Sequence, residues 1–191
     1  YSKNLIKKSA LLSLKPRIIV CNVDEKSLPD GNKYSAICKK KFPEENIIIV
    51  CADIEDQIMG LQTKDRKDFM LESGIKSTGL DNLIKTGYNT LGLSTFFTSG
   101  PEESRAWTIE KNSKAADAAG VIHSDFKKKF IRAETVTHED FIKYKGFNEC
   151  KNAGKLRLEG KDYLVNDGDV MYFRVGSWGL FNNLWQNSWN Y

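Results

Sequence analysis

The sequence predicts a mixed α/β chain in which a parallel strand–helix–strand unit is followed by helices and then by an α+β module. Short apolar runs at 18–21 and 47–52 flank a basic helical segment at 33–42. Strand–helix–strand order with short links is typical of a parallel sheet. Residues 62–90 carry apolar positions at helical spacing, and strand-like segments dominate beyond Leu93.

The composition is that of an ordinary globular protein. Of the 191 residues, 40% are hydrophobic and 28% are charged, which suffices for one domain or two small ones. A net charge of +4 is compatible with an RNA-rich partner without being specific to one. We expect no transmembrane helix and no membrane partner, because no apolar run approaches about 18 residues. The first residue is Tyr1, so we expect a fragment or a processed product.

The apolar runs at 18–21 and 47–52 predict strands that are buried on both faces. Residues 1–61 are too few for a complete α/β nucleotide-binding domain, so we interpret them as its last two strands. Within the segment that follows, the apolar spacing predicts helices at 65–71 and 80–88.

The second half predicts strands around one main helix. Residues 94–98 and 105–109 form the arms of a hairpin, and residues 115–130 read as the helix. Further strands are predicted at 131–136, at 163–165, and at 170–174 after an Asp-Gly-Asp turn. Strands of this number with one helix fit a β-grasp-like α+β module.

Cysteine usage favours a reducing compartment. The chain has four cysteines, none of them in a C-x-x-C pair: Cys21, Cys38, Cys51 and Cys150. We interpret them as reduced, mostly buried thiols of a cytoplasmic protein. Only two histidines, His123 and His138, accompany them, so we expect no metal site.

The turn after the first strand has the form Asn-x-x-Glu. In P-loop GTPases this turn is Asn-Lys-x-Asp, whose Asp takes two hydrogen bonds from guanine. Here Asn22 is kept, Val23 stands at the Lys and Glu25 at the Asp. The longer Glu would misplace its carboxylate and weaken guanine selection, which favours adenine read by backbone groups and by Val23 packing on the ring. The alternative is a polar turn with no ligand.

The second predicted strand ends at Cys51-Ala52, where a GTPase has a Ser-Ala-Lys turn whose backbone N–H groups touch the base. The sequence contains no G-x-x-x-x-G-K-[ST] phosphate loop. Such a loop cradles the phosphates and supplies a ligand to Mg²⁺. We therefore expect no catalytic residue in this chain and no ATP turnover by the chain alone.

Ordered motifs over about residues 11–174 closely resemble the YchF (Obg-like) ATPase family. The segments that carry the resemblance are 14–16, 22–25, 100–109, 118–126, 130–134, 153–163 and 167–171. Members of this family bind and hydrolyse ATP in preference to GTP and associate with ribosomes. The resemblance implies ATP as the ligand, with Mg²⁺ held by residues outside this chain.

The resemblance also implies a domain order. Residues 1–61 correspond to the C-terminal part of the P-loop NTPase (OBG-type G) domain and 62–91 to a helical connection. Residues 92–175 correspond to a TGS domain, which is a β-grasp module, and 176–191 form an atypical tail. Residue by residue, it implies nucleotide-base contacts at Asn22, Val23 and Glu25 and, more weakly, at Cys51 and Ala52.

A basic run in the second half is a candidate contact for RNA or the ribosome. Lys127, Lys128 and Lys129 are consecutive, and Arg132 follows on a predicted strand. Such a run either contacts phosphates or forms a solvated face. Nothing in the sequence indicates DNA as a partner.

Other polar and aromatic residues have structural alternatives. His123 with Asp125 and Glu134 suggests an acid–base set, but a core or capping histidine is the simpler interpretation. Arg105 and Trp107 suit stacking on a base, although a small β-grasp module also needs a large aromatic in its core.

The tail at 176–191 either docks on a partner through its aromatic residues or has no function. For the whole chain, the alternative to a YchF-type ATPase fragment is a stand-alone TGS interaction module, or the remnant of a split gene, that binds no nucleotide.

Overall fold

The computed structural model describes residues 11–12, 15–73, 75, 77–100 and 103–176. The chain divides into two compact units, Tyr1–Leu91 and Gly92–Tyr191, and each is described by itself. No helix in the described ranges is long and apolar enough to cross a membrane.

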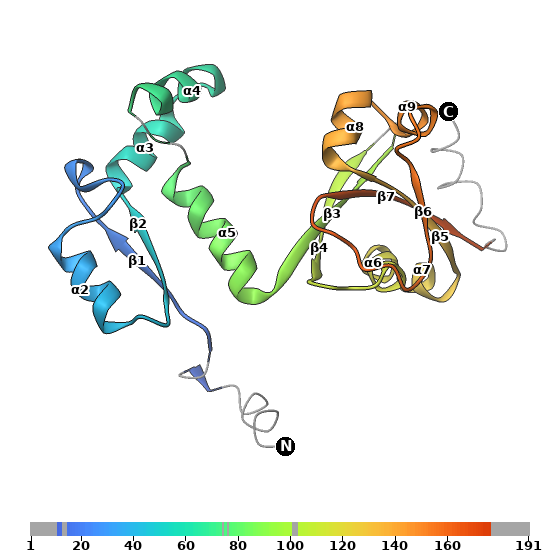
Figure 1. Cartoon of the computed structure of the whole chain (residues 1–191), viewed down its shortest axis with the longest axis horizontal. Coiled ribbons are helices and arrows are strands. Elements are labelled where there is room, and N and C mark those ends of the chain that lie inside the picture. Colours follow the sequence, from blue (N-terminus) through green and yellow to red (C-terminus); the bar gives the residue numbers. More distant parts are fainter. Residues whose placement is uncertain (1–10, 13–14, 74, 76, 101–102, 177–191) are drawn as a thin grey trace. The chain divides into compact units, whose positions relative to one another are not determined.

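The first unit contains the predicted strand–helix–strand arrangement. Strands β1 (Ile18–Asn22) and β2 (Asn46–Val50) pair in parallel, and α2 (Lys33–Lys41) connects them (Figure 1). Helix α2 begins at a capping box, in which the Asn32 side chain accepts from the amide of Ser35 and the Ser35 hydroxyl accepts from the amide of Asn32.

The prediction that both strands are buried on both faces is wrong for this structure. Val20 in the middle of β1 is 44% exposed, whereas Ile48 of β2 is buried. In the part of the chain that the structure describes, β1 and β2 form a sheet of two strands only. The apolar runs have the composition of inner strands, but these residues supply too few neighbouring elements to cover them.

Three helices complete the first unit: α3 (Ala52–Gly60), α4 (Thr63–Glu72) and α5 (Gly79–Leu91). The predictions at 65–71 and 80–88 are confirmed by α4 and α5, whereas α3 was not predicted. Its buried residues Ile54 and Ile58 lie four positions apart and pack with Cys51, Phe69 and Met70 into a small core.

The second unit is built on a five-stranded mixed sheet in the order β4-β3-β7-β5-β6. Its strands are β3 (Leu93–Ser99), β4 (Ser104–Glu110), β5 (Phe130–Thr137), β6 (Arg157–Glu159) and β7 (Asp169–Val175). Strands β3 and β7 pair in parallel and the other pairs are antiparallel. The predicted hairpin at 94–109 is confirmed by β3 and β4.

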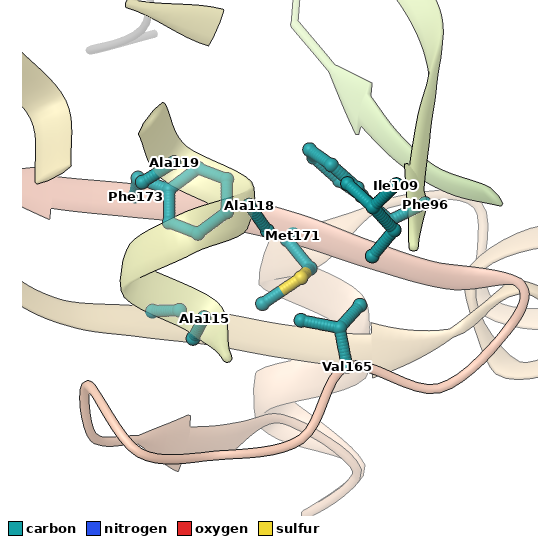
Figure 2. Close-up of a cluster of buried hydrophobic side chains, with 9 residues drawn as sticks. Phe96, Ile109, Ala115, Ala118, Ala119, Val165, Met171 and Phe173 are labelled. Carbon is teal, nitrogen blue, oxygen red and sulfur yellow. The ribbon is translucent and has the colours of Figure 1, made fainter. Parts of the chain in front are cut away.

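Helices cover both faces of this sheet (Figure 1). On one face, the small residues of α6 (Ala115–Ile122) let the helix lie close to Phe96, Met171 and Phe173 (Figure 2). On the other face, α8 (His138–Tyr144) and α9 (Phe147–Asn152) pack on Val136 and Val170. The sheet therefore has a separate apolar core on each side.

Two predictions about the second unit are corrected. The segment 115–130 is not one helix, because the extended backbone of His123 (φ −157°, ψ 137°) separates α6 from α7 (Ser124–Lys128). The predicted strand at 163–165 makes only an isolated bridge between Lys114 and Leu164, and β6 takes the place beside β5. Helices α8 and α9 were not predicted.

Candidate nucleotide-base site

Two loops meet at one edge of the β1–β2 sheet. Parallel strands end at the same edge, and Asn22 and Val50 are the last paired residues. The Asn22 Oδ1 atom accepts a hydrogen bond from the backbone amide of Ala52 at 3.0 Å. The amide of Val23 donates to the carbonyl of Val50 at 2.8 Å. These bonds fasten the Asn-x-x-Glu turn to the start of α3.

The turn continues into a single 3-10 turn, η2 (Glu25–Ser27). The Ser27 hydroxyl donates to the Asp24 carboxylate, and the Ser27 amide donates to the Asp24 carbonyl at 3.0 Å. Glu25 is exposed, and its carboxylate makes no ion pair with another residue of the described ranges. The turn is thus closed by Asp24 and leaves the Glu25 carboxylate facing solvent.

Val23 lies differently from what the sequence suggested. Its side chain is only 8% exposed, so it presents little surface to the ring of a base. Its backbone has the larger structural role, because the amide bonds to β2. The buried side chain and the backbone bond together fix the start of the turn.

The second loop holds Cys51 and Ala52. Cys51 is 1% exposed, precedes the first residue of α3 and belongs to the apolar core. Ala52 is exposed, but its amide is engaged by Asn22. A base contact from this loop through the Ala52 amide would therefore compete with the bond to Asn22.

Asn22 and Glu25, at and just after the end of β1, carry exposed polar side chains at this edge of the sheet. The sequence has no phosphate loop that could cradle phosphates. In the described ranges, no group of three or more His, Cys, Asp or Glu side chains lies where it could hold a metal ion.

The structure separates the four residues of the basic run. Lys127 pairs with Asp117 at 2.6 Å and Lys128 with Asp125 at 3.7 Å. Lys129 follows α7 as its C-cap residue, and its carbonyl accepts from the amide of Gly176. Arg132 lies on β5, and no ion pair joins it to another residue in the described ranges. Arg132 is the member of the run that is open to an anion.

His123 is a capping residue, as the simpler interpretation held. Its Nδ1 accepts from the amide of Asp125 at 3.2 Å at the start of α7. Glu134, the third member of the acid–base alternative, accepts from Arg174 Nε at 2.9 Å. The geometry therefore favours capping over catalysis for His123.

Trp107 packs against the core under α6, in agreement with the core interpretation. Its Nε1 donates to the Thr98 hydroxyl at 2.9 Å. The Arg105 guanidinium lies 4.3 Å from the centre of the ring. One face of the indole is thus already covered by a cation.

A buried polar network was missed by the sequence reasoning. Asp169 is 2% exposed and accepts from Arg157 at 3.1 Å, from the Tyr163 hydroxyl at 2.8 Å and from the amide of Asn166 at 2.9 Å. Burial, and next the bond to Asp169, raise the pKa of Tyr163. The sequence predicted only a turn at 167–169. The one indication of the network was the Asp that immediately precedes the predicted strand at 170–174.

All four cysteines are free in the structure. Cys51 and Cys150 are buried, as predicted, and burial raises the pKa of Cys150. Cys21 and Cys38 are partly exposed. Burial, followed by contact with the Cys38 thiol, raises the pKa of Cys21.

In fold, the chain is a mixed α/β protein similar to solved structures of nucleotide-binding proteins. The Schizosaccharomyces pombe YchF GTPase is 35% identical, with a TM-score of 0.76 over 90% of this chain and 46% of that chain. A GTP binding protein from Pyrococcus horikoshii OT3 is 17% identical, with a TM-score of 0.56 over 85% of this chain and 46% of that chain, and shows the fold alone.

The sequence belongs to the YchF family and matches the C-terminal part of its members. The family model "YchF-GTPase_C: Protein of unknown function (DUF933)" matches residues 93–176. The Ribosome-binding ATPase YchF of Bacillus subtilis is 48% identical over 176 residues, covering 90% of this chain and 48% of the relative. The protein of the same name from Escherichia coli O157:H7 is 44% identical over 172 residues, covering 90% and 47%. The chain thus spans about half the length of the curated relatives it matches.

Proposed function

We propose that the first unit supplies the base-binding end of an ATP site within a longer YchF protein. The observation that carries this proposal is the hydrogen bond between Asn22 Oδ1 and the Ala52 amide. It joins the loops that follow two neighbouring parallel strands, and ligands of open α/β sheets bind beyond the carboxyl ends of the strands. The bond holds the two loops in a fixed relation, which a base site formed by both loops requires.

The proposal commits to ATP, although the relatives are named both as ATPases and as a GTPase. Glu25 stands where a guanine-selecting Asp would lie, and its longer side chain displaces the carboxylate. Loss of well-placed hydrogen bonds to guanine removes the selection against adenine. Mg²⁺ and the phosphates are bound by residues outside this chain, so the residues seen here bind and orient the nucleotide without catalysing its hydrolysis.

The second unit, residues 92–175, is proposed to be a TGS domain of the β-grasp type that contacts the ribosome or RNA in the cytoplasm. Its first and last strands, β3 and β7, pair in parallel in the middle of the sheet, with the helix α6 packed on one face. That arrangement supports the β-grasp assignment. Residues 1–61 and 62–91 are assigned to the end of the nucleotide domain and to its helical connection.

A stand-alone interaction module with no nucleotide role is the less favoured function. The relatives match over 90% of the chain, so the similarity includes the first unit as well as the second.

The test joins the complete chain to the N-terminal half of the Bacillus subtilis relative and measures ATP and GTP binding by calorimetry. We expect ATP to bind more tightly than GTP, and Asn22→Ala to weaken ATP binding about tenfold, the equivalent of about 1.4 kcal/mol. Asn46→Ala is the matched control, because Asn46 opens β2 at the opposite edge and bonds to Thr90. Equal effects of the two substitutions would contradict the assignment.

A further inference from the structure

On the face of the second unit's sheet opposite α6, helices α8 and α9 cover Val136 and Val170 and leave a patch beside α9 partly exposed. Its residues come from three neighbouring strands and are called the sheet patch: Arg132, Glu134, Leu158, Tyr172 and Arg174. Arg132 lies opposite Arg174, Glu134 opposite Tyr172, and Glu134 opposite Leu158. Side chains directly opposite in antiparallel strands share a face, so the five side chains lie on one face of the sheet.

An irregularity in β5 places Arg132 in the patch. The register with β7 shifts between Phe130, which pairs with Val175, and Arg132, which pairs with Arg174. Phe130 packs against Phe173 in the core under α6, with ring centres 6.0 Å apart. A β-bulge lets Phe130 enter that core while Arg132 is directed to the other face, and bulges are frequent where a functional side chain is re-aimed.

The patch contains two arginines, Arg174, which is held by an ion pair, and Arg132, which is exposed. Arg174 donates to Glu134 at 2.9 Å, and its guanidinium lies 4.4 Å from the centre of the Tyr172 ring. The bond to Glu134 raises the pKa of Arg174. Arg132 is exposed opposite this cation and makes no ion pair within the described ranges. Like charges directly opposite destabilise a sheet, and an anion bound at Arg132 would reduce that repulsion.

The Arg174 guanidinium and the Tyr172 ring are stacked, with Tyr172 on the side of α9 and Arg174 partly exposed to solvent. Tyr172 contacts Phe147 of α9, with ring centres 6.5 Å apart, and carries Arg174 on its ring face. The Arg174 side chain is 44% exposed, so part of its planar group is accessible. Beside it, Leu158 is 61% exposed on a strand at the edge of the sheet. The patch thus offers one planar cation and one exposed apolar side chain.

We propose that the sheet patch binds single-stranded RNA, which rests on the proposed RNA contact of this unit and specifies where it lies. The Arg174 plane, supported by Tyr172, stacks on an unpaired base, and Arg132 contacts the adjoining phosphate. Unstacked bases commonly lie on aromatic rings or guanidinium planes of an open sheet. An acidic peptide suits the patch less well, because Arg174 already forms an ion pair with Glu134. A duplex suits it less well, because its bases are stacked on one another.

The experiment measures fluorescence anisotropy of a labelled single-stranded ten-nucleotide RNA with the complete chain over a range of salt. Stacking on one base is worth about 1–3 kcal/mol, so Arg174→Ala should weaken binding at least fivefold. Arg132→Gln removes one phosphate contact and should lower the slope of log affinity against log salt by about 0.7. Lys114→Gln is the matched control, because it removes the same charge from an exposed side chain that Asp162 already neutralises.

Two further measurements separate the explanations. Arg174→Lys keeps the charge and loses the planar group, so it should weaken binding nearly as much as Arg174→Ala if stacking is the contact. Circular dichroism shows whether each variant remains folded. No RNA binding by the unaltered chain would overturn the proposed RNA contact itself. Equal weakening of RNA binding by Arg132→Gln and Lys114→Gln would overturn the sheet patch alone. Equal competition by duplex RNA, or preference for an acidic peptide, would do the same.

Discussion

The hydroxyl of Tyr163 lies 2.8 Å from the carboxylate of Asp169, a side chain that is only 2% exposed. The same hydroxyl accepts from Asn166 Nδ2 at 2.8 Å and from Arg157 at 3.2 Å. A buried carboxylate is costly unless its oxygens are satisfied. Tyr163 therefore ties the loop before β7 to the first residue of that strand.

Removing this hydroxyl should destabilise the second unit. Tyr163→Phe leaves Asp169 with the bonds from Arg157 and the Asn166 amide, and we expect a loss of about 1 kcal/mol at neutral pH. Chemical denaturation followed by circular dichroism measures it. Tyr172→Phe is the control, since it removes a phenol hydroxyl that lies 3.4 Å from Arg174 and has no contact with Asp169. Equal losses for the two variants would show that the network has no special role.

The same pair predicts a pH dependence. The pKa of Tyr163 is raised in the folded state above the ordinary value of about 10. The stability that the bound proton contributes is complete below about pH 10 and is lost as the pH rises through the raised pKa. The difference in unfolding free energy between the unaltered chain and Tyr163→Phe should therefore narrow above about pH 10. A difference that grew with pH would contradict this assignment.

Two glycines of α5 should respond in opposite directions to the same substitution. A Cβ on Gly79 would lie 2.7 Å from Val50 Cγ1 and 2.9 Å from Glu55 Oε1, so Gly79→Ala should cost about 1–3 kcal/mol. Gly87 has no atom within 4 Å of such a Cβ, and Gly87→Ala should stabilise the helix by about 0.5–1 kcal/mol. Thermal unfolding of both variants tests the close approach of α5 to β2.

The length of the Glu25 side chain should influence base selection. In the joined protein with the Bacillus subtilis N-terminal half, Glu25→Asp shortens the carboxylate by one methylene and brings it toward the position that guanine requires. We expect the preference for ATP over GTP to fall about tenfold, since two charge-assisted hydrogen bonds exceed about 1.4 kcal/mol. Glu44→Asp, at an exposed position before β2, serves as the control. An unchanged ratio of the two dissociation constants would exclude Glu25 from the base site.

The chain alone should release no phosphate from ATP above background. Positioning and charge stabilisation of the phosphates supply nearly all of phosphoryl-transfer catalysis, and the 191 residues contain no phosphate loop. Malachite-green detection of phosphate measures the rate, with the full-length Bacillus subtilis relative as the positive control. A rate that persists through a second purification would contradict the expectation.

The sequence predicted the positions of most strands and helices, and the failures have physical reasons. Helix α8 could have been predicted from Thr137, because Thr is a favoured residue at a helix N-cap. In the structure its hydroxyl accepts from the amide of Asp140 at the helix start. The prediction of a strand at 163–165 is wrong, because these residues lie in a loop. There the Tyr163 hydroxyl bonds to Asp169 and Val165 packs in the core under α6. Residues 177–191 of the predicted tail lie outside the described residues.

The sequence alone determined the family, the positions of most strands and the loop that carries Asn22. These features depend on local residue patterns and on motif order along the chain. Only the tertiary structure decided that Val23 is buried, that Asn22 engages the Ala52 amide, and that Arg132 lies opposite Arg174. Each depends on register between segments distant in sequence, and a shift of one residue exchanges the faces of a strand. Local patterns alone do not specify that pairing.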